Sequence, residues 1–319
     1  MRARLARTAR FFFFGSFASL LFFYSFMASA WNAGSHRLVA LIAWDRLSPA
    51  ARREVATLLR AHPDFESWTK RSRGQNLDET AFIEASTWPD DIRGDRRFYS
   101  DRAPRSGKAG APLPGFPDMA RHADWHFRNL PFGKSGKNGP SVLPRYVRPG
   151  QLDEQLKRLS EDLSPGKGTL ARRAFVLPWV IHLVGDAHQP LHAAYRVDRP
   201  RLTVGNPFNP RKPISTLHAF WDDLPAPSRL RGKTLRKATD VLTAAYPRSA
   251  FRNLSAPPGT WIEESFRIAR AKGYPAGLGG GPITKAFFES SREIARRRAA
   301  LAGYRLALLL NRLLAPKTE

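Results

Sequence analysis

The chain has 319 residues and carries 52 lysines and arginines against 27 aspartates and glutamates, a formal net charge of +25. It contains no cysteine, which excludes disulfides and thiolate metal ligands and argues against an iron–sulfur cluster. The charge favours polyanionic partners such as nucleic acid or an anionic membrane surface. The arginines are scattered, however, and also fit a general compositional bias, so charge alone selects no partner.

The N-terminal segment, residues 1–30, has the pattern of an export signal. Four arginines precede an apolar stretch at 11–27, and Ala28-Ser29-Ala30 has the small residues of a cleavage site. The alternative is a retained membrane anchor, but an apolar run of about 17 residues is at the short limit for a span. We therefore expect an exported protein, periplasmic or secreted, without stable membrane insertion after cleavage, whose mature chain begins at Trp31.

The rest of the chain has the pattern of a helical protein. The clearest helix start is Ser48-Pro49, an N-cap followed by proline at the first helical position. The last predicted helix has apolar residues at helical spacing, typical of a helix packed in a core. The predicted helices cover residues 31–45 (entered by Gly34-Ser35), 48–60, 152–163, 169–188, 233–245, 261–271 and 284–314.

Three segments rich in proline, glycine and lysine separate these helices: 99–117, 131–150 and 197–215. We interpret them as surface loops and not as domain linkers, because histidine and carboxylate motifs lie on both sides of each. No run of alternating residues suggests a sizeable sheet. The prediction is a mainly α-helical protein with a single compact domain, residues 31–319.

The most informative segment runs from His182 to His192 and reads HLVGDAHQPLH. His182 and Asp186 are four residues apart, so on a helix they share one face and can bind one cation. Pro190 breaks that helix and re-aims His192. Polar groups buried at this density are costly without partners, and a metal satisfies them best. The alternative is an apolar core helix with a few hydrogen-bonded histidines.

Other segments repeat this chemistry. His218 and Asp222 have the same spacing of four residues. Together with further candidates they provide more ligands than one zinc ion needs, which makes a multi-zinc site plausible. Histidine and carboxylate ligands without cysteine suit zinc or another borderline cation. The further candidates are His36, Asp90, His126 and His192.

Some histidines and tryptophans are expected to have no part in this chemistry. His188 faces away from His182 on the predicted helix, so we interpret it as a structural hydrogen-bonding residue. His62 and His122 lie outside any motif and are expected at the surface. Trp44 and Trp88 are expected in the core.

These motifs together resemble the zinc-dependent S1/P1 nuclease family, which is related to the bacterial zinc phospholipases C. The resemblance extends from Trp31 to about Leu314, and it rests mainly on the 182–192 segment combined with the N-terminal tryptophan. It also includes Trp261-Ile-Glu-Glu264-Ser265 and the segment 302–311. The implied fold is the single helical domain of the phospholipase C and P1 nuclease type.

Carried over residue by residue, the resemblance implies three zinc ions (Zn²⁺) per chain. The first would have four side-chain ligands, Asp90, His126, His182 and Asp186. The second would be bound by the amino and carbonyl groups of Trp31, by His36 and by Asp186, which would then bridge two ions. The third would be bound by His192, His218 and Asp222, and its three protein ligands leave room for water or substrate.

The resemblance also implies catalytic residues beside the metals. Asp90 is counted among these catalytic residues because it is a metal ligand. Arg93 matches a basic position that stabilises charge on the pentavalent phosphate; the alternative is a surface salt bridge, for example with Asp91. Asn206, in the pair Gly205-Asn206, matches an asparagine that helps to position phosphate and the attacking water.

Phe127 and Asn129 match the family's nucleobase pocket, where an aromatic ring stacks on a base and a polar side chain reads its edge. Stacking suits unpaired bases and contributes about 1–3 kcal/mol per base, which favours single strands. An ordinary core role for Phe127 is equally open. Two departures from the family pattern, Val204 in place of a glycine and Thr216 in place of an asparagine, put the shape of the 197–215 loop in question.

The resemblance therefore implies a zinc-dependent endonuclease that hydrolyses single-stranded DNA and RNA to 5′-phosphorylated products, and it leaves a 3′-nucleotidase activity open. Its partner would be single-stranded nucleic acid or nucleotides, and no protein partner is implied. Two alternatives remain: a phospholipase C-like zinc phosphodiesterase acting on phospholipids, and a non-catalytic basic zinc-binding envelope protein. The ending His218…Trp221-Asp222 favours the nuclease, because the phospholipases carry glutamate as the ligand there.

Overall fold

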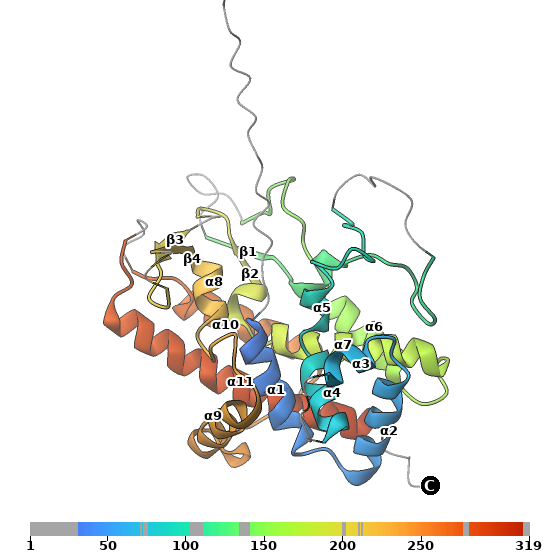
Figure 1. Cartoon of the computed structure of the whole chain (residues 1–319). Coiled ribbons are helices and arrows are strands. Elements are labelled where there is room, and N and C mark those ends of the chain that lie inside the picture. The colour runs from blue at the N-terminus through green and yellow to red at the C-terminus, as the bar shows by residue number, and fades with distance from the viewer. Residues whose placement is uncertain are drawn as a thin grey trace, which may run out of the picture.

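A computed structural model describes residues 31–70, 72, 76–102, 111–133, 141–199, 202–209, 211, 213–276 and 281–314. The predicted export signal, residues 1–30, lies outside them. As predicted, the fold is mainly helical and forms a single compact body (Figure 1). Across the ranges just given, no helix combines the length and the apolar character that crossing a bilayer requires.

The helices, in chain order, are α1 (Ala33–Trp44), α2 (Pro49–Arg60), α3 (Phe65–Thr69), α4 (Leu77–Ala85), α5 (Trp88–Asp91), η1 (Ala123–His126), α6 (Leu152–Leu163), α7 (Leu170–Asp186), η2 (Pro190–His192), α8 (Leu217–Asp222), α9 (Gly232–Ala245), η3 (Arg248–Ala250), α10 (Pro258–Lys272) and α11 (Lys285–Leu314), where η marks a 3₁₀ helix. The short strands are β1 (Leu130–Phe132), β2 (Ala194–Arg196), β3 (Thr203–Gly205) and β4 (Ile214–Thr216).

Capping side chains explain where several helices begin. Ser48 accepts a hydrogen bond from the Ala51 N–H at the start of α2, and Thr169 accepts one from the Arg172 N–H at the start of α7 (both 3.2 Å). The start of α1 differs from the prediction. Its cap is Asn32, whose side-chain oxygen accepts the N–H of Ser35 at 3.0 Å, and not Gly34-Ser35.

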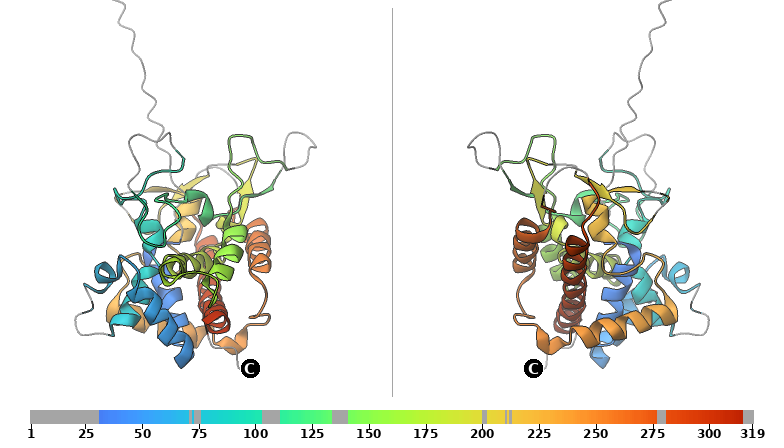
Figure 2. Two further views of the ribbon diagram at one scale, coloured as in Figure 1. Left: turned by 90° about the vertical axis from the view of Figure 1, so that its right-hand side faces the viewer. Right: turned by 90° about the vertical axis from the view of Figure 1, so that its left-hand side faces the viewer.

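The core is organised around α7, which is buried at every position from Arg173 to Asp186. A helix that is buried on all sides must be surrounded by other elements, and α2, α5, α6 and α11 all pack against α7. Helix α1 lies along α11 on one side of this core (Figure 2). Trp44 and Trp88 are core residues as predicted.

The strands and long loops lie at one end of the helical body (Figure 1). β1 pairs with β2 in parallel, and β3 pairs with β4 in an antiparallel hairpin. This hairpin occupies part of the segment predicted as the 197–215 loop. Val204 is buried with Leu217 and Phe220, and Thr216 caps α8 by accepting the Ala219 N–H at 3.1 Å. Both departures from the family pattern thus have a structural role in this chain.

The prediction that His62 and His122 lie at the surface is wrong. Both are buried, because each imidazole stacks on a nearby tryptophan. The His62 ring lies 4.5 Å from the ring of Trp68, and the His122 ring lies 3.7 Å from that of Trp125. An aromatic stacking partner compensates for the loss of water in a way that spacing along the chain does not reveal.

Candidate metal centre

The structure brings the predicted histidine and aspartate ligands together in three groups, the first two of which share His182. In each group the ligand atoms lie within 4.8 Å of one another. The third group coincides with the ligands predicted for the third zinc, and the second contains three of the four predicted for the first. The groups are His36, Asp90 and His182; His126, His182 and Asp186; and His192, His218 and Asp222.

These residues come from six elements that meet where the helical body joins the layer of strands and loops (Figure 1). Helix α7 carries two of them on one face, as the spacing of four residues predicts, and the break after α7 turns the chain into η2. The contributing elements are α1 (His36), α5 (Asp90), η1 (His126), α7 (His182 and Asp186), η2 (His192) and α8 (His218 and Asp222).

Asp186 is the centre of the cluster and is fully buried. Its Oδ2 lies 3.1 Å from His182 Nε2 and 3.2 Å from His126 Nδ1. Its Oδ1 lies 3.4 Å from His192 Nδ1 and 3.5 Å from His36 Nε2. The two oxygens of one carboxylate thus face different pairs of histidines, which is the arrangement that a bridging ligand requires.

His36 reaches this cluster because α1 and α7 approach closely. Its ring stacks on that of His182 with centroids 3.9 Å apart and planes 11° apart. A Cβ on Gly185 would lie 2.8 Å from His36 Nδ1, so any side chain there would displace the imidazole. The glycine inside the central motif is therefore required by packing, a role that the sequence analysis missed.

Neighbouring groups fix the orientation of several ligands. His182 Nδ1 donates to the carbonyl of Ser86 at 2.8 Å, and His192 Nδ1 donates to the carbonyl of His126 at 2.7 Å. Gln189 Nε2 donates to Asp222 Oδ1 at 2.7 Å. Such bonds select the tautomer and the ring orientation that present the other nitrogen to a metal. Gln189 and Ser86 are functional candidates that sequence reasoning missed, although Gln189 lies inside the central motif.

The third group has one partly exposed ligand, as the first has in Asp90. The rings of His192 and His218 stack with centroids 4.8 Å apart. Asp222 Oδ2 lies 3.7 Å from His218 Nε2, and the His218 side chain is 25% exposed, whereas those of His192 and Asp222 are buried. His218 is thus the ligand of this group that solvent can reach.

The buried atoms of the cluster test whether a metal fits. Three ligand-type atoms that face the cluster are buried and have no hydrogen-bond partner among the described residues. A buried polar atom without a partner destabilises a fold by about 1–3 kcal/mol, so three of them in one place indicate a missing partner. A zinc ion accepts lone pairs from both atom types. The atoms are His36 Nε2, Asp186 Oδ1 and Asp222 Oδ2; His126 faces the other ligands with Nδ1, and Asp90 Oδ1 pairs with Arg93.

The electrostatics agree with the binding of a cation. Burial lowers the pKa of His36 to about 4 and that of His126 to about 3, which keeps both imidazoles in the neutral, metal-binding form at neutral pH. Burial alone would raise the pKa of Asp186, but His182 and His192 hold it well below its usual range. Burial raises the pKa of Asp222 well above its usual range, and a neighbouring cation would favour its charged form.

Arg93 lies at the edge of this cluster. Its Nη2 is 3.1 Å from Asp90 Oδ1, and its side chain is 13% exposed. The ion pair is thus made with a predicted ligand and not with Asp91. Asp91 accepts a hydrogen bond from Thr87 Oγ1 at 2.8 Å, and the metal groups include Asp90 and not Asp91.

Trp31 is fully buried. The backbone N–H of the next residue, Asn32, donates to the carbonyl of Asp222 at 3.2 Å, and its side-chain amide donates to Asp223 Oδ1 at 2.8 Å. These bonds fix the beginning of the described chain against α8. They hold the main chain of Trp31 near an element that carries two predicted ligands.

The other predicted residues lie outside the cluster. Asn206 stands in the β3–β4 hairpin, where its side-chain oxygen accepts the Phe208 N–H at 3.0 Å, so its role toward phosphate stays a prediction. Phe127 is buried, and the guanidinium of Arg102 lies 5.4 Å from its ring centroid. Asn129 Nδ2 donates to the Arg148 carbonyl at 2.8 Å. These contacts show packing at Phe127 and leave base recognition a prediction.

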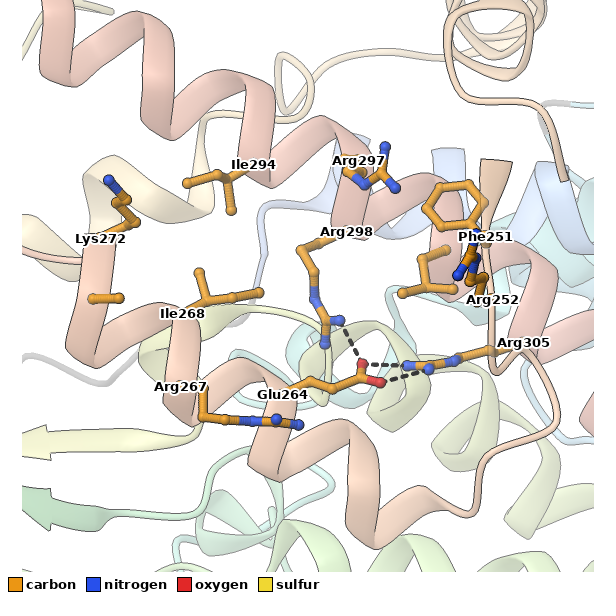
Figure 3. Close-up of a pocket in the computed structure, with 12 residues that line it drawn as sticks. Phe251, Arg252, Glu264, Arg267, Ile268, Lys272, Ile294, Arg297, Arg298 and Arg305 are labelled. Atoms are coloured by element: carbon orange, nitrogen blue, oxygen red, sulfur yellow. Dashed lines mark hydrogen bonds and ion pairs between the residues drawn. The ribbon is translucent and has the colours of Figure 1, made fainter. Parts of the chain in front are cut away.

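His188 is a hydrogen-bonding residue, as predicted. Its Nδ1 donates to the carbonyl of Val184 at 2.7 Å, and its Nε2 accepts from Arg305 Nη1 at 3.0 Å. Burial, together with Arg298 and Arg305, holds its pKa well below the usual range, so the ring is neutral. Both arginines pair with Glu264 (Figure 3).

Comparison with known proteins agrees with this geometry. The model of the S1/P1 Nuclease family matches residues 31–315. Endonuclease 2 of Arabidopsis thaliana is 30% identical over 285 residues, which cover 80% of this chain and 93% of the relative. Endonuclease 4 of the same plant is 29% identical over 156 residues and Endonuclease 1 is 27% identical over 164 residues. The chain spans about half the length of these two relatives, 52% and 53%.

Proposed function

The chain belongs to the S1/P1 nuclease family, and on that premise we propose that it is a zinc-dependent endonuclease that hydrolyses single-stranded DNA and RNA to 5′-phosphorylated products. The observation that carries the proposal is the buried cluster around Asp186, in which three ligand-type atoms lack hydrogen-bond partners among the described residues. Neither a packed helical core nor a simple basic binding surface accounts for such a cluster.

Three zinc ions per chain are part of the proposal. The ligands would be those of the three predicted sets, with Asp186 shared by two ions and the main chain of Trp31 completing one of them. Zinc bound at such sites lowers the pKa of water and neutralises charge on a phosphate.

The chain's own residues would orient the substrate around this centre. Arg93 places a guanidinium beside Asp90, where it could stabilise negative charge that develops on phosphorus. The partly exposed His218 marks the side on which substrate enters. Phe127 and Asn129, just before β1, are proposed to bind a base, the ring by stacking and the amide at the base edge. Asn206, in the β3–β4 hairpin, is proposed to contact the phosphate.

Export of the mature chain is a further part of this proposal. Cleavage after Ala30 would create the α-amino group of Trp31, whose ordinary pKa of about 7.7 allows a metal to displace its proton near neutral pH. N-terminal sequencing of protein purified from the secreted or periplasmic fraction should begin at Trp31. Active protein that retains residues 1–30 would contradict the use of this amino group.

Parallel hydrolysis assays test the proposed activity. The substrates are denatured DNA, duplex DNA, RNA, a 3′-mononucleotide and phosphatidylcholine vesicles, each with the wild type and with Asp186→Asn. We expect cleavage of denatured DNA and RNA well above that of the duplex, 5′-phosphate ends on the products, and loss of all cleavage in the variant. Activity on phosphatidylcholine alone would support the phospholipase alternative, and nucleic-acid binding without turnover would support a non-catalytic protein. Unchanged hydrolysis in Asp186→Asn would refute the assignment of the cluster.

A further inference from the structure

We propose that Glu264, Ser265, Arg298 and Arg305 are positioning residues that hold the turn between Asp186 and His192 in the shape that binds metal. This proposal rests on the metal centre of the proposed function. It concerns residues that are neither predicted ligands nor members of the proposed substrate site.

The turn between the two ligands is fixed from behind by α10 and α11. Ser265 Oγ donates to the carbonyl of Ala187 at 2.6 Å, and Arg298 Nε donates to the carbonyl of His188 at 3.3 Å. Arg305 Nη1 donates to the imidazole of His188 at 3.0 Å. The carbonyls of Ala187 and His188 and the imidazole of His188 are therefore all hydrogen-bonded to side chains of α10 or α11.

One carboxylate holds these donors in place. Glu264 Oε2 accepts from Arg298 Nη1 and from Arg305 Nη1 at 2.7 Å each, and Glu264 Oε1 accepts from Arg305 Nη2 at 2.8 Å. Arg298 Nη2 also donates to Ser265 Oγ at 2.9 Å. Figure 3 shows the Glu264 carboxylate of α10 between the two guanidinium groups of α11. Bidentate pairing of this kind fixes direction as well as distance.

The turn is also hydrogen-bonded to a ligand of the third metal group. Gln189, the residue after His188, donates from its side chain to Asp222 Oδ1 at 2.7 Å, and its side-chain oxygen accepts the Leu191 N–H. A shift of the turn would therefore move Gln189, His192 and the orientation of Asp222 together. Since Asp186 begins the same turn, the shared carboxylate would move as well, but its position on α7 holds it more firmly.

Glu264, Arg298 and Arg305 line a cavity together with other residues of α10 and α11 (Figure 3). The cavity has a volume of about 470 Å³ and is lined by these charged residues and by apolar side chains such as Ile268 and Ile294. Arg298 and Arg305 are 5% and 1% exposed. Because Glu264 already occupies both guanidinium groups, we assign the cluster to positioning and not to the binding of an anion from the cavity.

Zinc release from the full-length mature protein tests the proposal. The bound zinc of the wild type, Arg298→Gln and Ser265→Ala is titrated with a colorimetric chelator, and the melting temperature is measured in parallel. We expect the chelator concentration that removes the first zinc to fall about 10- to 100-fold in Arg298→Gln, the usual cost of losing a residue that orients a ligand. Ser265→Ala, a change small enough to keep the fold, should show a fall of several-fold. In both variants kcat on denatured DNA should fall more than KM rises.

Arg173→Gln is the matched control. Arg173 is also a buried arginine that donates to a glutamate, Glu54 Oε1 at 2.7 Å, and to a backbone carbonyl, Leu163 at 2.9 Å. It lies at the opposite end of α7, so this variant should lose stability and keep wild-type zinc release. Equal zinc release in all three variants and the wild type would overturn the positioning role. A wild type that binds no zinc would instead refute the proposed function, so the two failures are distinguishable.

Discussion

Two buried clusters of charged and polar side chains lie on opposite sides of the segment from Asp186 to His192, and they differ in how their atoms are satisfied. In the rear cluster (Glu264, Arg298 and Arg305), the Glu264 carboxylate has both arginines as partners, and those arginines also donate to backbone carbonyls. In the front cluster (Asp186 and the surrounding histidines), several buried atoms have no hydrogen-bond partner among the described residues.

The difference shows how the same residue types serve two purposes. A buried charge is stable when it is paired and hydrogen-bonded, and removal of one partner leaves the other uncompensated. In the Glu264 cluster the carboxylate and both guanidinium groups have partners of opposite charge within the protein, although Arg305 Nε has no hydrogen-bond partner among the described residues, and we interpret this cluster as structural. The Asp186 cluster meets it only when a cation is added, so it indicates a site for a ligand.

Removal of metal should produce the largest effect and should affect only the front cluster. Dialysis against a strong chelator should abolish hydrolysis of denatured DNA and lower the melting temperature by roughly 5 to 10 °C, because a ligand that binds only the native state stabilises it by mass action. Differential scanning calorimetry and an activity assay on the same samples measure both. Zinc should restore both properties, and full activity in metal-free protein would remove the distinction between the clusters.

Substitutions of the adjacent residues Asp90 and Asp91 should differ in their effect on kcat. Asp90→Asn removes a predicted ligand that also pairs with Arg93, and we expect kcat on denatured DNA to fall about a hundredfold to a thousandfold, equivalent to about 3–4 kcal/mol. Asp91→Asn makes the same change one residue later, at a side chain hydrogen-bonded to Thr87. That variant should stay within a few-fold of wild type. Equal losses in the two variants would contradict the choice of Asp90.

The charge of Glu264 in the rear cluster should make the free energy of unfolding depend on pH. Burial alone would raise the pKa of Glu264, but Arg305 and Arg298 lower it to about 2. A carboxyl whose pKa is lowered in the folded state contributes stability above its unfolded pKa of about 4.3, and that contribution is lost as the pH falls toward 2. Glu264→Gln should therefore lower the free energy of unfolding by about 2 kcal/mol at pH 7, after allowance for solvent screening.

Denaturant titrations at pH 7 and pH 3 measure this difference. The deficit of Glu264→Gln relative to wild type should shrink at pH 3. Glu263→Gln, at an exposed neighbouring position on α10, should have little effect at either pH. A deficit that is the same at both pH values would show that the stability of Glu264 does not depend on its charge.

The sequence made the front cluster and most long helices predictable because both depend on local patterns. The spacing of four residues in His182/Asp186 and His218/Asp222 places each pair on one helical face, and Ser48 and Thr169 are recognisable caps. Helix α4 also has a local signal, the cap Asn76 followed by two acidic residues, which the sequence analysis missed. The five-residue helix α3 and the three-residue strands lack such signals, since their stability depends on tertiary packing.

The rear cluster could not be predicted in the same way. Glu264 and Arg305 are separated by 41 residues, and nothing in their neighbours along the chain shows that the two side chains meet. The burial of His62 and His122 has the same origin, because stacking on a tryptophan depends on how the chain folds around each ring. Asn32 became the cap of α1 because its side chain could reach the Ser35 N–H.

The zinc content of the purified mature protein tests the central claim most directly. Elemental analysis, made on the same sample that is assayed on denatured DNA, gives the ratio of zinc to protein. The two pairs of helical ligands, the bridging position of Asp186 and the partnerless atoms together predict about three zinc ions per chain. A ratio of zero or one in protein that cleaves denatured DNA would contradict the account.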